Sequence, residues 1–95
     1  SANDAILQDM LRYESLASSL RAEVQVALTR TTDKYNACLP SIPRGDFDEL
    51  IEEIGRTRGA PLTVSERDSI LGVWAAAKEQ ATKLSMRVAA NREEG

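Results

Sequence analysis

Apolar residues recur every three or four positions through the first 39 residues, a stretch that contains neither glycine nor proline. Because this spacing places side chains on one face of a helix, it predicts a long amphipathic helix over about residues 3–37. Asn3 or Asp4 can cap its first turn. The alternating steps of three and four are the period of a coiled coil, so we expect another helix to pack on this face. The face consists of Ile6, Met10, Tyr13, Ala17, Leu20, Val24, Ala27, Leu28, Thr31 and Tyr35.

A proline-rich segment, residues 39–43, ends this helix, because proline lacks a backbone donor and pushes the residue before it towards an extended conformation. Asp46 then caps a short helix over about residues 47–57, whose apolar positions have the spacing i, i+3, i+4, i+7. Gly55 or Gly59 can supply the left-handed residue that closes it. The apolar positions are Phe47, Leu50, Ile51 and Ile54.

A third helix is predicted over about residues 64–90. Thr63 and Glu66 have the spacing of a capping box, in which each residue accepts a hydrogen bond from the backbone of the other. The apolar positions again alternate between steps of three and four, and residues 92–95 are predicted to form a frayed tail. The apolar face consists of Ile70, Val73, Trp74, Ala77, Ala81, Leu84 and Val88.

These elements predict an all-α fold, an elongated antiparallel bundle of two long helices with one short helix between them in sequence. Residues 1–95 are too few for a second domain and are expected to form one helical domain. Two long helices cannot cover both apolar faces fully, so part of each face is expected to meet a partner protein or a second copy of the chain.

Five large apolar residues lie outside the predicted faces. Scattered surface leucines are ordinary in monomeric proteins, whereas a clustered set indicates a second binding surface, and the pattern alone leaves both interpretations open. These residues are Leu7, Leu11, Val26, Leu71 and Met86.

The chemical inventory argues against catalysis. The chain has no histidine and one cysteine, Cys38, so the commonest general base, the histidine-activated nucleophiles and most zinc sites are missing from the sequence. We therefore expect a non-enzymatic protein with no cofactor and no metal site.

Cys38 cannot close a disulfide within the chain, which favours a reducing compartment and a cytoplasmic location. A secreted or injected effector stays an alternative. No apolar stretch approaches the roughly 18–20 residues that cross a bilayer.

A nucleic-acid-binding adaptor is the second functional hypothesis. The short helix and the third helix can be interpreted as a helix-turn-helix, with Arg56, Arg58 and Arg67 near the phosphates. The formal net charge of −3 and the apolar sequence that follows Arg67 count against this interpretation.

The first functional hypothesis is a protein–protein interaction module that presents amphipathic helix faces to a partner or to itself. Small acidic helical hairpins resemble export chaperones, accessory subunits of bacterial secretion or flagellar systems, and injected effectors, although no motif selects one class. An adaptor, chaperone-like or assembly role is therefore expected. The predicted anchors are Leu16, Leu20, Val24, Leu28, Trp74, Leu84 and Val88.

Overall fold

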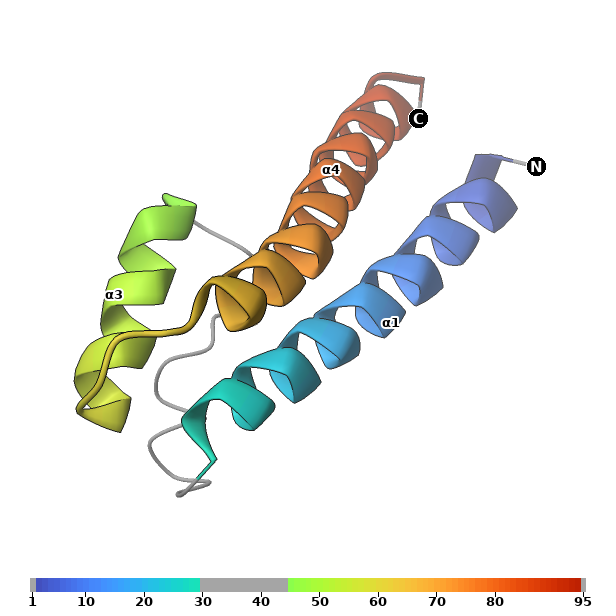
Figure 1. Cartoon of the computed structure of the whole chain (residues 1–95). Helices are drawn as coiled ribbons and strands as arrows, with labels where there is room; N and C mark the ends of the chain where they lie inside the picture. Colours follow the sequence, from blue (N-terminus) through green and yellow to red (C-terminus); the bar gives the residue numbers. More distant parts are fainter. Residues whose placement is uncertain (1, 30–44, 95) are drawn as a thin grey trace.

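The computed structural model describes residues 2–29 and 45–94, which form three helices and their short connections (Figure 1). They are α1 (Ala2–Leu28), α3 (Phe47–Arg58) and α4 (Val64–Glu94), and no strand occurs in these two ranges. α1 and α4 run antiparallel, and α3 lies at the end where α1 finishes and α4 begins (Figure 1). The molecule measures 49 × 21 × 21 Å. The predicted all-α, elongated antiparallel bundle is confirmed.

The start of α4 follows the predicted capping box. The backbone N–H of Thr63 donates to the Glu66 carboxylate at 2.8 Å, and the backbone N–H of Glu66 donates to the Thr63 hydroxyl at 3.1 Å. Both bonds satisfy donors that the first turn of a helix leaves without partners.

The ends of α3 also follow the sequence. The Asp46 carboxylate accepts a hydrogen bond from the backbone N–H of Asp48 at 3.2 Å and caps the first turn. Of the two candidate glycines, Gly59 takes the left-handed conformation, with φ of 80°, and its N–H donates to the Gly55 carbonyl at 2.8 Å.

Two helix boundaries differ from the prediction. α1 ends at Leu28 rather than near residue 37, because Thr29 takes a left-handed φ of 56° that an α-helix cannot continue through. α4 continues to Glu94, so the expected frayed tail is helical as far as that residue. No glycine or proline occurs in residues 73–94, so the sequence has no helix-breaking residue there. The predictions for Thr31, Tyr35 and Cys38 concern residues outside the described ranges.

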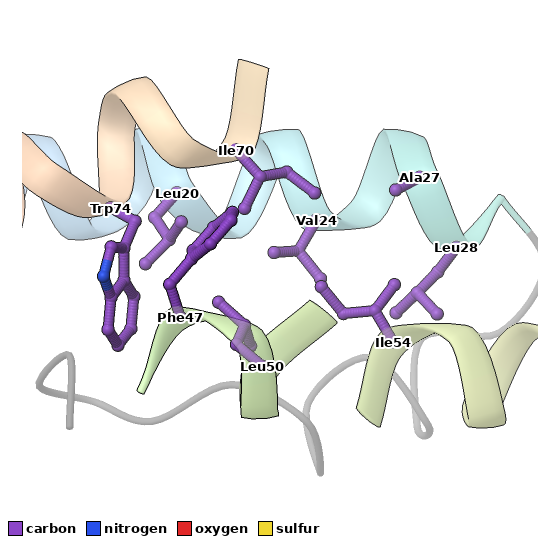
Figure 2. Close-up of a cluster of buried hydrophobic side chains, with 9 residues drawn as sticks. All are labelled: Leu20, Val24, Ala27, Leu28, Phe47, Leu50, Ile54, Ile70 and Trp74. Carbon is purple, nitrogen blue, oxygen red and sulfur yellow. The ribbon is translucent and has the colours of Figure 1, made fainter. Parts of the chain in front are cut away.

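The hydrophobic core lies where all three helices meet. Figure 2 shows side chains of α3 pointing towards those of α1 and α4. The rings of Phe47 and Trp74 have centroids 6.1 Å apart and are tilted by 49°. We call this end of the molecule the base. Its buried cluster consists of Leu20, Val24, Ala27, Leu28, Phe47, Leu50, Ile54, Ile70 and Trp74.

Candidate protein-binding surface

Beyond the base, α1 and α4 continue side by side without α3. We call this part the arm; it comprises residues 2–19 of α1 and 75–94 of α4. Since α3 packs only at the base, one face of the arm has no third helix over it within the described residues (Figure 1). The question is which side chains that face carries.

Helix periodicity identifies the face, because positions 18 residues apart are separated by about five turns and point the same way. On α1, Met10 repeats the direction of Leu28 and Ile6 repeats that of Val24. Leu28 is 4% exposed beneath α3, whereas Met10 is 48% exposed. Ile6 is half-buried, although Val24 is fully buried.

The same shift along α4 gives the matching position. Val88 lies 18 residues after Ile70 and is half-buried, whereas Ile70 is completely buried at the base. We define the open face as these three arm positions, Ile6, Met10 and Val88, together with Leu7 and Leu11 beside them on α1.

Exposed apolar side chains cluster at this end of α1. Leu7 and Leu11 are 55% and 63% exposed and, with Met10, have the helical spacing i, i+3, i+4. Met86 is also exposed on α4. Leu7 and Leu11 are therefore neighbours of Met10 on α1 and not isolated surface residues.

The contact between α1 and α4 in the arm contains buried polar groups. The Asp9 side chain is 8% exposed, and its Oδ2 lies 2.8 Å from Nη1 of Arg87. Gln80 is buried, and its Nε2 has no hydrogen-bond partner in the described part of the chain. Desolvated polar groups oppose burial unless they are satisfied, so this contact is less stabilising than the base.

Sequence reasoning did not assign these two polar positions to the interior. Asp9 lies four residues before Tyr13, and Gln80 lies three residues after Ala77, so each has the step that joins neighbouring positions of a buried face. The spacing of Asp9 and Gln80 could have assigned them to the buried face, but their polar side chains indicated surface positions instead.

The predicted anchors separate into two groups in the structure. Leu20, Val24, Leu28 and Trp74 are at most 6% exposed in the core of the base, so a partner can reach them only if the helices separate. Residues of α3 already pack against these four side chains in the same buried cluster. The remaining three, Leu16, Leu84 and Val88, are half-buried in the arm.

Trp74 borders a shallow hollow of about 510 Å³ between α3 and α4. The Lys78 ammonium lies 5.5 Å from the centroid of the Trp74 ring and donates to the Gly45 carbonyl at 3.2 Å. The indole is therefore packed from one side by Phe47 and approached by a cation, and it is core rather than a ligand platform.

The three arginines of the nucleic-acid hypothesis are each bound to a carboxylate. Arg56 pairs with Glu53 at the exposed surface of α3. Arg67 lies 3.2 Å from the Asp48 carboxylate, and its guanidinium lies 5.2 Å from the centroid of the Phe47 ring. A phosphate would have to compete with these carboxylates.

Arg58 joins all three helices at the base. Its Nη1 donates to the Ala27 carbonyl and to the Glu66 carboxylate, both at 2.6 Å, and its Nη2 donates to the Pro61 carbonyl at 2.9 Å. The bond from Arg58, with that from the Thr63 backbone, lowers the pKa of Glu66 to about 2. Arg58 therefore links the end of α1 to the start of α4, and its guanidinium group is occupied by these structural hydrogen bonds.

The described residues show neither a group of side chains that could bind a metal ion nor a helix that could span a membrane. Within residues 2–29 and 45–94, no three histidine, cysteine or acidic side chains are grouped in a way that could hold a metal ion. The helices in these ranges also lack a segment with the length and apolar character needed to cross a membrane.

No protein-family model, curated protein or solved structure matches this chain. Function is therefore inferred from the geometry of the base and the arm.

Proposed function

We propose that the protein is a non-enzymatic protein–protein interaction module, and that a helix of its partner covers the open face of the arm. One observation carries the proposal. The positions of Val24, Leu28 and Ile70 are covered by α3, while their repeats about five turns away have no covering helix among the described residues.

Covering the open face would bury apolar side chains that are about half exposed in the monomer. Complete burial of a Leu or Met side chain contributes about 1.5–3 kcal/mol relative to full exposure. Leu7, Met10 and Leu11 are each only about half exposed and belong to one cluster, so together they offer a partner a contiguous apolar contact. An amphipathic helix is the element that fits such a contact.

An adaptor, chaperone-like or assembly role in the cytoplasm is part of this proposal. Its support is the open face, the missing histidine and the single Cys38. The nucleic-acid alternative receives no support from the arginines, because Arg56, Arg58 and Arg67 all have carboxylate partners.

Site-specific photo-crosslinking in the native host tests the proposal. A photoreactive residue at Met10 is expected to give a discrete covalent adduct. The same residue at Ser19, which is exposed on the opposite face of α1, is the matched control and is expected to give none. Equal labelling from both positions, or no discrete adduct from Met10, would exclude the open face as the binding surface.

A further inference from the structure

Both methionines of the chain lie in the arm, Met10 on α1 and Met86 on α4. Their side chains are 48% and 67% exposed, although methionine is among the residue types that are most often fully buried in proteins. The buried cluster of the base contains neither of them. Solvent therefore reaches both side chains that carry a thioether sulfur.

The two methionines differ in what surrounds them. Met10 repeats the direction of Leu28, which is buried at the base with residues of α3, and it belongs to the open face. Met86 lies 18 residues after Asp68, which is exposed, so its direction on α4 is one that α3 leaves uncovered even at the base.

The helical neighbours of the two methionines differ in the same way. The residues three or four positions before Met10 are Ile6 and Leu7, and Leu11 follows it directly, so Met10 lies within an apolar cluster. The residues three or four positions from Met86 include no large apolar side chain; they are Thr82, Lys83, Ala89 and Ala90. Met86 is thus an isolated apolar side chain on its helix.

An exposed thioether reacts with peroxides in a two-electron step. The sulfur lone pair attacks one oxygen of hydrogen peroxide, the O–O bond breaks and a sulfur–oxygen bond forms. The departing hydroxide takes the proton of the transferred hydroxyl group and leaves as water, so the sulfur is oxidised and the peroxide is reduced. The product, methionine sulfoxide, is polar, and methionine sulfoxide reductases convert it back to methionine.

We propose that Met10 is an oxidation site, and that its conversion to the sulfoxide by hydrogen peroxide weakens binding at the open face. The inference rests on the proposed function, since it names the regulation of the same surface. A partner helix that covers the cluster removes water from the side chain of Met10, which costs free energy for a sulfoxide oxygen but not for a thioether. Oxidation of Met86 leaves the open face unchanged, because Met86 points away from that face.

Two single-methionine variants of the full chain test the inference. Met86→Leu keeps Met10, and Met10→Leu, its matched counterpart, keeps Met86; exchange of methionine for leucine conserves volume. Each carries a photoreactive residue at Leu7, on the open face. Each is treated with hydrogen peroxide or left untreated, freed of peroxide, and crosslinked in an extract of the native host.

The yield of the adduct after treatment is divided by the yield before it within each variant, so an effect of the substitution itself does not enter the comparison. Cys38 is present in both variants, and oxidation of its thiol would change both ratios equally. Mass spectrometry measures the oxidation of each methionine at the time of crosslinking, and circular dichroism measures helix content.

Peroxide is expected to oxidise the remaining methionine of both variants, because both side chains are exposed. In Met86→Leu the yield of the adduct is expected to fall about tenfold, which corresponds to about 1.4 kcal/mol of binding free energy, with helix content unchanged. Treatment with a methionine sulfoxide reductase is expected to restore it. In Met10→Leu the ratio is expected to stay near one.

An adduct that persists in Met86→Leu after Met10 is oxidised, or equal losses from the two variants, overturns the inference and leaves the proposed function standing. Resistance of Met10 to peroxide, or a loss of helix content on its oxidation, overturns the inference in the same way. Absence of the adduct from both untreated variants refutes the proposed function, and the inference falls with it.

Discussion

The base and the arm are built from the same two helices, yet they bury different kinds of residue. At the base, aliphatic and aromatic side chains from three helices enclose Ile54 and Ile70 completely. In the arm, the contact between α1 and α4 holds Tyr13, the small residues Ala17 and Ala77, and the polar side chains of Asp9 and Gln80. The third helix makes the difference, because it covers the face that α1 and α4 leave open between them in the arm.

This contrast shows how a helical face with one continuous period can serve two purposes. Its covered half supplies stability and its uncovered half keeps large apolar side chains in contact with solvent. Stability should therefore respond to substitutions at the base and association to substitutions in the arm. Four predictions test or refine that division.

Ile54→Ala is expected to have the largest effect, lowering the free energy of unfolding by about 2–5 kcal/mol, because it opens a cavity under α3. Leu11→Ala, a comparable truncation at a side chain that is 63% exposed, is expected to change it by less than about 0.5 kcal/mol. Urea denaturation followed by circular dichroism, at a concentration where the protein is monomeric, measures both. Equal losses would abolish the distinction between base and arm.

Arg58→Ala is expected to destabilise the protein by about 1–3 kcal/mol, because it leaves the Ala27 carbonyl and the Glu66 carboxylate without this donor. Arg56→Ala is the control, since its ion pair with Glu53 is largely exposed and contributes about 0–1 kcal/mol. Thermal denaturation of both variants compares them. A harmless Arg58→Ala would show that α3 is held at the base by apolar contacts alone.

Lowering the pH should weaken the hydrogen bonds that the Glu66 carboxylate accepts from Arg58 and from the Thr63 backbone. The pKa of Glu66 is lowered to about 2 in the folded protein from 4.5, so between these values the unfolded chain binds a proton that the folded chain does not. The stabilisation from Glu66 is fully present above about pH 4.5 and is lost as the pH falls towards 2. Wild type is thus expected to be more stable than Glu66→Gln at pH 6, and the two should converge near pH 2.

Denaturation midpoints measured from pH 6 to pH 2 provide this comparison. Glu53→Gln serves as the control, because the exposed pair of Glu53 with Arg56 contributes little at pH 6. A constant difference between wild type and Glu66→Gln across the range would contradict the assignment.

Gln80→Leu is expected to give the smallest effect and the opposite sign, stabilising the monomer by about 1 kcal/mol. It replaces a buried amide whose Nε2 has no partner in the described residues with an apolar side chain of similar size. Gln25→Leu, at an exposed position of α1, should be nearly neutral. Destabilisation by Gln80→Leu would mean that the amide contributes to the contact between α1 and α4.

The sequence predicted the elements well because local chemistry decides where they begin. The capping box at Thr63 and the cap at Asp46 depend on residues two or three positions away. The end of α1 was missed because Thr29, a β-branched residue, takes a left-handed φ that its identity does not favour.

The candidate surface was harder to predict, because burial depends on where α3 packs. Periodicity placed Leu28 and Met10 on one face, correctly, but gives no means to tell that only Leu28 lies under α3. The bonds of Arg58 to Ala27 and Glu66 join residues distant in sequence and were also beyond local patterns.

The arm has buried polar groups and no third helix among the described residues, whereas the base encloses Ile54 completely. The arm should therefore open locally while Ile54 stays enclosed, so amide hydrogen exchange should slow progressively from Ile6 to Val24. Any molecule bound to the open face must first hold the two helices of the arm together. Its binding would be detected as slower exchange in arm residues that it never touches.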